Sequence, residues 1–197
     1  HLENCVLEFI SYLINKYKLK KPYKIVLAGG VFANVLLNSK IAKLSGLNEL
    51  FIFPNMGDGG LTAGAAAAIE ADDTKSFNSN KMKTIYLGRP ISNEEIFLAI
   101  KKHNCKYKYL ENIENYIAKL LSENKVIARF NGKMEFGPRA LGNRSILYSA
   151  KDPSVNNWLN KKLKRSEFMP FAPVVMDEIS KDYFKINQNI PTKYMTI

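Results

Sequence analysis

Apolar residues recur with helical spacing from Cys5 to Tyr17, which predicts a first amphipathic helix. Short apolar runs at Lys24–Ala28 and Leu50–Phe53 predict buried strands, each closed by glycine or proline. Helices are predicted from Val31 to Leu44 and in the alanine-rich stretch that ends at Ala71. We expect the alanines to press that helix tightly against its neighbours. This alternating order of helices and strands predicts an α/β layer.

The apolar pattern fades from Ala71 to Lys83, where Asp, Thr, Ser and Asn gather. We therefore predict three parts: residues 1–74, a linker at 75–83, and a second domain at 84–197. In that domain, Ser92 and Glu95 have the spacing of a capping box for a helix that runs to about Asn104. Two more helices are predicted, one at Ile113–Leu121 and one after Asp152-Pro153 with Val155, Trp158, Leu159 and Leu163 on its buried face. Strands are expected at Cys105–Leu110, Lys125–Phe130, Ile146–Ser149 and Phe171–Met176.

Positive charge is concentrated in the second part of the chain. Residues 1–75 carry 8 Lys or Arg against 7 Asp or Glu, whereas residues 76–197 carry 21 against 11. Most of the lysines are explained by a solvated surface. The five arginines all lie after residue 75, and three of them fall between Arg129 and Arg144. Because a guanidinium group holds phosphate or carboxylate with two parallel hydrogen bonds, these arginines indicate an anionic ligand.

Two glycine turns follow the first two predicted strands. Gly29-Gly30 lie between a strand and a helix, where glycine lets backbone N–H groups approach a ligand and the helix N-terminus favours negative charge. A plain strand-to-helix turn explains this pattern equally well. Asp58, within Gly57–Gly60, follows the second strand, a usual place for a metal or nucleotide contact in open α/β sheets. The spacing alone slightly favours the alternative, in which Asp58 is the N-cap of the next helix.

The strongest candidate cluster is Lys133–Ser145, between two predicted strands. Its glycine and proline residues predict a shaped loop rather than a helix. It brings together Lys133, Arg139 and Arg144, and cations at this density repel one another unless an anion lies among them. A ligand with two phosphates, or with a phosphate and a carbonyl group, would satisfy the loop. A solvated basic loop is the alternative. Three further polar residues complete the candidate binding loop, namely Glu135, Asn143 and Ser145. Glu135 could orient one of the arginines.

A second basic stretch, Lys161–Pro173, follows the last long helix. Its lysines suit the C-terminal end of that helix, and its phenylalanines and prolines suit a core. Arg165 and Glu167 are the candidate site residues of this stretch, and a solvated basic surface is the alternative.

These stretches, taken in order, resemble the O-carbamoyltransferases that act on nodulation factors and on aminoglycoside and cephem antibiotics. Ala28–Asn34 and Pro54–Gly60 look like the end of the actin-like ATPase domain of that family. Glu135–Leu147 looks like the signature of its C-terminal domain, which is similar to threonylcarbamoyl-adenylate synthases. The resemblance therefore implies the end of an actin-like α/β domain followed by a smaller α/β domain.

The resemblance also implies a reaction in two steps. Carbamoyl phosphate and ATP give carbamoyl-adenylate in the C-terminal domain. A divalent metal ion, iron or magnesium, then helps the actin-like domain to pass the carbamoyl group to an acceptor hydroxyl of a small molecule or sugar. The residues that match the nucleotide-binding positions are Gly29, Gly30, Asn34, Gly59 and Gly60, and the one that matches a metal ligand is Asp58. Catalytic roles fall to Lys133, Arg139 and Arg144, and contacts to carbamoyl phosphate and the ATP phosphates fall to Lys133, Glu135, Arg139, Asn143, Arg144, Ser145 and Arg165.

Two departures from the family pattern bear on this assignment. The other metal ligands of the family are histidines in an HxxxH-type pattern, and no such pair occurs in this sequence. Many members also have Arg directly before the Pro-Phe-Ala-Pro run, where this chain has Met169. We therefore expect the chain to lack a complete metal site, and we expect either Arg165 to supply the missing positive charge or one phosphate contact to be absent.

Composition restricts the setting of the protein. No apolar run approaches the roughly 18–20 residues that span a bilayer, so we expect no membrane partner. Cys5 and Cys105 lie on different predicted segments and are expected to be small core residues rather than a disulfide. This cysteine usage favours a reducing compartment, the cytoplasm. The sequence gives no prediction of oligomeric state.

Two other function classes remain as alternatives. A basic nucleic-acid-binding module would use the positive charge after residue 75, but no aromatic stacking platform interleaves with the basic residues. A sugar or acetate kinase of the actin-like superfamily would explain the glycine turns and would leave the arginine-containing loop without a purpose.

Overall fold

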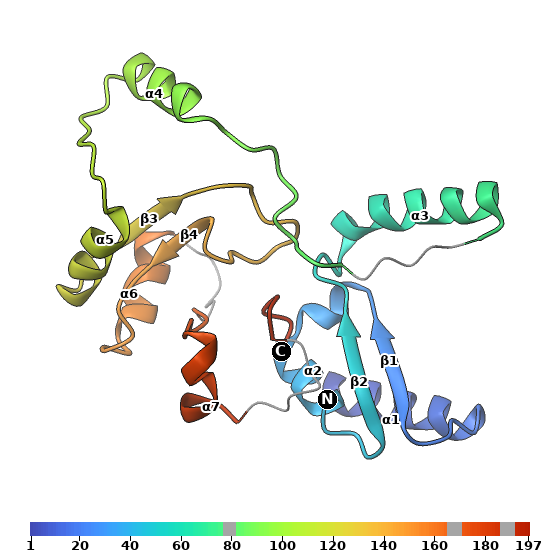
Figure 1. Ribbon diagram of the computed structural model, residues 1–197. Helices are drawn as coiled ribbons and strands as arrows, with labels where there is room; N and C mark the ends of the chain where they lie inside the picture. Colours follow the sequence, from blue (N-terminus) through green and yellow to red (C-terminus); the bar gives the residue numbers. More distant parts are fainter. Residues whose placement is uncertain (77–81, 165–170, 186–191) are drawn as a thin grey trace. The chain divides into compact units, whose positions relative to one another are not determined.

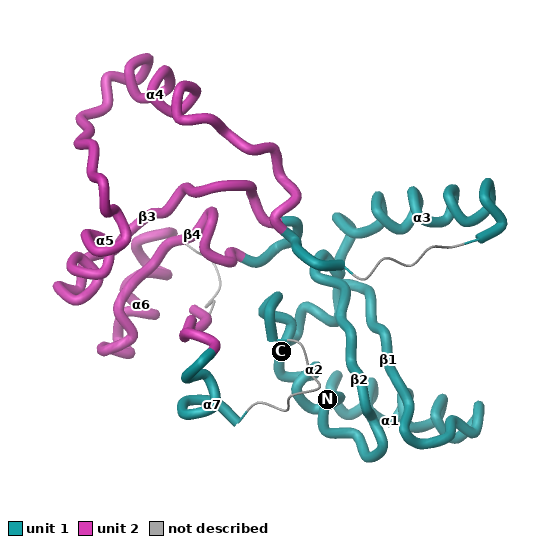
Figure 2. Tube along the Cα trace, in the orientation of Figure 1, with its two compact units in different colours: residues 1–85, 136–139, 178–197 teal, residues 86–135, 140–177 magenta. Residues whose placement is uncertain are grey.

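The computed structural model describes residues 1–76, 82–164, 171–185 and 192–197 (Figure 1). The chain forms two compact units, and neither is one continuous segment (Figure 2). Unit 1 contains residues 1–85, 136–139 and 178–197, and unit 2 contains residues 86–135 and 140–177. Four residues from the middle of the Lys133–Ser145 loop therefore belong to unit 1. The sequence pattern predicts a single division at 75–83 instead.

The core of unit 1 lies between a small parallel sheet and two helices. Strand β1 (Tyr23–Leu27) pairs in parallel with β2 (Leu47–Ile52), with Ile25 opposite Leu50. Helices α1 (Leu2–Lys16) and α2 (Val35–Ile41) supply apolar residues to this core. Leucine and isoleucine fill its centre because their apolar area gains most from leaving water. The residues that form the buried cluster are Ile10, Leu27, Leu37, Ile41, Leu50, Ile52 and Met56.

The end of the chain returns to this core. The side chain of Thr196 is almost fully buried, and Ile197 packs against the apolar cluster. The amide nitrogen of Asn38, a fully buried residue of α2, donates a 2.6 Å hydrogen bond to the backbone oxygen of Thr196. The last residues are therefore part of unit 1. The short elements η3 (Asp177–Ile179) and α7 (Ser180–Tyr183) precede them in the chain.

The alanine-rich helix does not pack as expected. Helix α3 (Leu61–Thr74) follows the short η2 helix (Asp58–Gly60) and extends away from the sheet (Figure 1). None of its residues is buried, and Leu61 and Ile69 are 69% and 62% exposed. The prediction of a helix pressed against its neighbours was therefore wrong for this chain, although small residues do permit such contact.

Unit 2 is built around an antiparallel hairpin. Strand β3 (Ile127–Phe130) pairs with β4 (Arg144–Leu147), with Phe130 opposite Arg144. Helix α5 (Ile113–Ser122) contacts β3. Helix α4 (Asn93–Lys102) begins at Ser92 with the predicted capping box, in which Ser92 and Glu95 each accept a hydrogen bond from the other's backbone. Helix α6 (Val155–Lys162) completes the described secondary structure of this unit.

Several predicted elements are corrected by the structure. The segment Cys105–Leu110 is not a strand, because its alternating pattern has no partner strand among the described residues, and Tyr109 is 83% exposed. Phe171–Met176 is not a strand either, since Pro173 has no N–H to donate to a ladder. Both cysteines are exposed rather than in cores. Only Leu159 is buried on the predicted inner face of α6, where Trp158 is half exposed.

The predicted helix Val31–Leu44 is interrupted. A short η1 helix (Gly30–Ala33) precedes α2, and the side-chain oxygen of Asn34 accepts hydrogen bonds from the backbone of Leu36 and Leu37. Asn34 is thus the N-cap of α2, the position where Asn is most favourable. No helix in the described parts of the chain has the length and apolar character that a membrane span needs.

The core assignment is testable with a pair of leucines. Leu50→Ala removes a fully buried side chain from β2 and leaves a cavity, so we expect a loss of about 2–5 kcal/mol in the free energy of unfolding. Leu98→Ala in α4 removes a side chain that is 65% exposed and should cost less than about 0.5 kcal/mol. Urea unfolding followed by circular dichroism measures both. Equal costs for the two variants would contradict the assigned core.

Candidate functional site

The loop between β3 and β4 is organised by one carboxylate. Oε1 of Glu135 accepts hydrogen bonds from the backbone N–H groups of Leu141, Asn143 and Arg144, at 2.9, 2.8 and 3.1 Å. The Glu135 side chain is buried, with the residue 7% exposed. The backbone of Glu135 also forms a bridge with Tyr86, whose hydroxyl donates to the Leu141 oxygen at 2.7 Å. These contacts join the two ends of the loop, up to Glu135 and from Leu141 onward, within unit 2.

The same contacts determine the charge of Glu135. Burial by itself raises the pKa of this carboxyl group, because it disfavours the ionised form. The backbone hydrogen bonds outweigh burial and hold the pKa of Glu135 below its ordinary value. The group is therefore an anion at neutral pH. It supports the loop through the backbone of Arg144 rather than by pairing with an arginine side chain.

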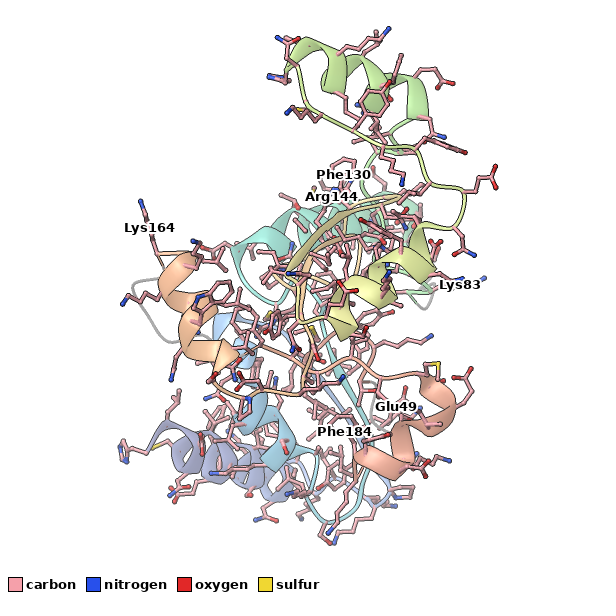
Figure 3. The ribbon with its side chains drawn as sticks, turned by 90° about the vertical axis from the view of Figure 1, so that its left-hand side faces the viewer. Glu49, Lys83, Phe130, Arg144, Lys164 and Phe184 are labelled. Carbon is pink, nitrogen blue, oxygen red and sulfur yellow. The ribbon has the colours of Figure 1, made fainter. Side chains whose placement is uncertain are left out.

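Arg144 is held in place by backbone oxygens. Its Nη1 donates to the oxygens of Asn131 and Asn143 at 2.7 and 3.0 Å, and its Nη2 donates to Gly132 at 3.2 Å. Its guanidinium carbon lies 3.6 Å from the centre of the Phe130 ring, a cation–π contact between opposite residues of the hairpin (Figure 3). These contacts use three of the five guanidinium hydrogens. One hydrogen on Nη2 and the one on Nε have no partner among the described residues.

The other predicted members of the loop in unit 2 take distinct positions. Lys133 is exposed and its ammonium group makes no hydrogen bond to the described residues. Nδ2 of Asn143 donates to the Lys133 backbone oxygen at 2.8 Å, which fixes the start of the loop to its end. Ser145 is buried and its Oγ accepts from the Gly142 N–H at 2.8 Å. Lys133 and Arg144 are thus the cations that this rigid loop presents.

Arg139 belongs to unit 1 instead. Its Nη2 donates a 2.7 Å hydrogen bond to the backbone oxygen of Ala33, in the turn that follows β1. The structure therefore does not bring Arg139 together with Lys133 and Arg144 in one unit. Arg165 and Glu167 lie outside the described residues.

The two glycine turns of unit 1 line one pocket. Its volume is about 420 Å³, and it lies at the carboxyl ends of β1 and β2, where ligands of α/β sheets commonly bind. The Gly29 N–H donates to the Met56 oxygen at 2.7 Å, which joins the two turns directly. Four of the predicted nucleotide- or metal-binding residues line this pocket, namely Gly29, Gly30, Asp58 and Gly60. Gly59 and Asn34 are not among its lining residues, and the Asn34 oxygen is already used as the cap of α2.

The pocket does not form a metal site by itself. Asp58 is exposed and opens η2, so its alternative role as the N-cap of α3 is wrong, since Gly60 holds that position. No group of three or more His, Cys, Asp or Glu side chains gathers anywhere in the described residues. A divalent ion needs several oxygen or nitrogen ligands, and Asp58 supplies one carboxylate. The residues that the structure describes therefore do not hold a metal ion on their own.

Sequence reasoning missed several residues of these sites. Tyr86 closes the Glu135 loop from 55 residues away, and Asn38 holds the turn after β1 through the Phe32 oxygen. Ala63, Gly64 and Ala67 line the pocket rather than a helix interface. The small side chains of α3 are the signal that could have predicted a pocket wall. No local pattern indicates the partners of Tyr86.

The geometry thus defines an α/β chain with a glycine-lined pocket in one unit and a rigid basic loop in the other. Two family models match this chain, one over its N-terminal part and one over its C-terminal part. The family described as Carbamoyltransferase N-terminus matches residues 1–67, and the one described as Carbamoyltransferase C-terminus matches residues 118–197. The chain belongs to the carbamoyltransferase family, which confirms the resemblance drawn from its glycine turns and arginine-containing signature.

Individual relatives agree with this assignment. An uncharacterized protein of Methanocaldococcus jannaschii is 37% identical across the whole of this chain and 32% of its own length. Nodulation protein NolO of Bradyrhizobium diazoefficiens is 29% identical over 83% of this chain and 30% of its own length. Nodulation protein U of Rhizobium tropici is 27% identical over 98% of this chain and 32% of its own length. The chain thus spans about a third of the length of these relatives.

The structural role of Glu135 predicts a specific pH dependence. Because its pKa is lower in the folded chain than in the unfolded chain, ionised Glu135 stabilises the fold above the ordinary carboxyl pKa. That stability is lost as the pH falls through the lowered pKa. Glu135→Gln should cost about 1–3 kcal/mol at neutral pH and should flatten this part of the pH profile. Urea unfolding of the full chain at a series of pH values measures the effect.

Glu111→Gln is the matched control, because Glu111 is an exposed glutamate of the same unit. It should leave both the stability and its pH dependence unchanged. A Glu135→Gln variant with the stability and pH profile of the unaltered chain would show that the three backbone hydrogen bonds do not organise the loop.

Proposed function

We propose that this chain is part of an ATP-dependent O-carbamoyltransferase. Carbamoyl phosphate, ATP and water give carbamoyl-adenylate, phosphate and pyrophosphate. The carbamoyl group then passes to the hydroxyl group of a small molecule or sugar, which loses its proton as AMP leaves. The observation that carries this proposal is the loop built on Glu135, which presents Lys133 and Arg144 from a fixed backbone. Preplaced cations stabilise the negative charge that develops during adenylate formation. Membership of the carbamoyltransferase family supports carbamoyl phosphate as the anion that this loop binds.

The contacts of Arg144 define how it would bind a phosphate group. Three of its hydrogens are fixed on the oxygens of Asn131, Asn143 and Gly132, so the guanidinium group cannot rotate freely. The hydrogens that remain on Nε and Nη2 provide two donors for one phosphate, the bidentate geometry that arginine favours. Lys133, whose side chain is exposed, supplies a second charge on a flexible stem. The buried Ser145 hydroxyl accepts from the Gly142 N–H and so supports the backbone of the loop.

The pocket of unit 1 is the proposed nucleotide site. Its volume of about 420 Å³ lies within the roughly 300–1,000 Å³ typical of small-molecule sites. Gly29 and Gly30 leave the backbone open to close approach by a ligand, and Gly29 has a positive φ of 121° that favours glycine. A metal ion in this region would need ligands beyond Asp58.

The setting and the fold arrangement are also proposals. Two exposed, unpaired cysteines are consistent with a reducing compartment such as the cytoplasm. The mixed α/β units are consistent with the end of an actin-like domain followed by a domain similar to threonylcarbamoyl-adenylate synthases.

Calorimetric titration of carbamoyl phosphate into the full chain tests the proposal. We expect saturable binding, and we expect Lys133→Ala to weaken it by about tenfold or more, the loss of one charge-assisted hydrogen bond. Arg89→Ala is the matched control, because Arg89 is an exposed arginine of unit 2 that pairs with Glu95. It should leave the affinity unchanged.

The salt dependence of binding separates the proposal from the nucleic-acid alternative. A small anion in this loop should show a shallow dependence on salt, whereas a nucleic acid that contacts several phosphates should lose affinity steeply. Absence of carbamoyl phosphate binding in a folded sample, together with steep salt-dependent binding of RNA or DNA, would contradict the carbamoyltransferase proposal.

A further inference from the structure

The turn after β1 is the feature on which the wall of the unit 1 pocket depends. Gly29 and Gly30 line the pocket, and the turn continues through η1 to Asn34. Within the turn, the Phe32 N–H donates to the Gly29 oxygen at 3.0 Å and the Asn34 N–H donates to the Val31 oxygen at 3.2 Å. A short helix of this kind is marginal by itself, so contacts from elsewhere must hold it.

Two side chains from other elements take up the last carbonyl groups of this turn. Nδ2 of Asn38 donates to the Phe32 oxygen at 2.7 Å. Nη2 of Arg139 donates to the Ala33 oxygen, also at 2.7 Å, from a position 106 residues further along the chain. Both donors belong to unit 1. Asn38 lies on α2, the helix that follows the turn. Arg139 lies in the family signature, Glu135–Leu147, so its contact connects the signature to the turn.

The segment that carries Arg139 is itself anchored in unit 1. The ring of Phe136 packs edge-on against Phe53, with 6.1 Å between ring centres, and the Phe136 N–H donates to the Ile85 oxygen at 2.6 Å. Gly137 has a φ of 126°, and a Cβ atom there would lie 2.9 Å from the Pro54 oxygen. Only glycine permits this approach without strain. Phe53 also lines the pocket, so the anchor of Arg139 and the pocket share a wall.

We propose that Arg139 is a positioning residue, which holds the Gly29–Ala33 turn in the shape that the nucleotide pocket requires. Its one hydrogen bond among the described residues goes to the turn, and its Nε is buried without an acceptor there. A buried donor without a partner costs free energy, so this placement needs a compensating contact, which the Ala33 oxygen provides. Arg139 therefore acts on the ligand through the turn, whereas Lys133 and Arg144 act in unit 2. The identity of the ligand rests on the function proposed above.

Amide hydrogen exchange in the full chain tests this role without any ligand. Arg139→Ala should raise the exchange rates of the Phe32 and Asn34 amides by about tenfold, because the turn loses its remote contact. Arg139→Lys keeps one terminal donor and lacks Nε, so it should recover most of the protection. Arg89→Ala, in unit 2, should leave these amides unchanged. Exchange in β1 and β2 should stay unchanged in every variant, which distinguishes a local effect from general destabilisation.

Titration with the non-hydrolysable ATP analogue AMP-PNP supplies the second measurement. Arg139→Ala should weaken its binding several-fold while leaving the affinity for carbamoyl phosphate unchanged, and Arg139→Lys should restore AMP-PNP binding. Unchanged exchange at Phe32 and Asn34 in Arg139→Ala would overturn the positioning role. Reduced carbamoyl phosphate affinity with unchanged exchange would also overturn it and make Arg139 a direct ligand. If the unaltered chain binds no AMP-PNP, the proposed nucleotide pocket fails, and the exchange rates still decide the role of Arg139.

Discussion

The buried carboxylate of Glu135 is the interaction on which the candidate anion site depends. Three backbone N–H groups converge on one of its oxygens, so the loop that returns to β4 has a single fixed path. Without an acceptor at this point, three donors would be left unsatisfied at large cost. The carboxylate also offsets part of the positive charge that Lys133 and Arg144 bring to the loop. Glu135 thus makes a basic site possible without itself being available to a ligand.

The family signature serves both units of the chain. Its ends, around Glu135 and Arg144, build the rigid loop of unit 2, whereas its centre, Phe136–Arg139, packs in unit 1. The centre is shaped by glycine at 137 and by the edge-on contact of Phe136 with Phe53, and it carries Arg139 to the turn after β1. A signature of this kind combines residues that would bind ligand with residues that position the backbone. The sequence of the signature shows a dense group of cations. It does not show which of them belong to unit 1 and which to unit 2.

Local signals were sufficient for much of the fold. Short apolar runs predicted β1 and β2, and the capping box at Ser92 placed the start of α4. Cys105–Leu110 was also predicted as a strand and is not one, because a strand needs a neighbour that the local pattern does not reveal. The role of Arg139 could not be predicted from the local sequence either, since its partner Ala33 is 106 residues away. The residue types in a sequence do not indicate which distant backbone oxygen a side chain will bind.

The most direct test of the account is a map of the backbone amides that respond to carbamoyl phosphate. A two-dimensional nitrogen–proton NMR spectrum of the full chain, recorded during titration, reports each amide separately. We expect the largest shifts on Lys133 and on residues 142–145, the backbone that Glu135 organises. Shifts spread over the exposed lysines of α4, with none in that loop, would contradict the claim that Glu135 builds an anion-binding site.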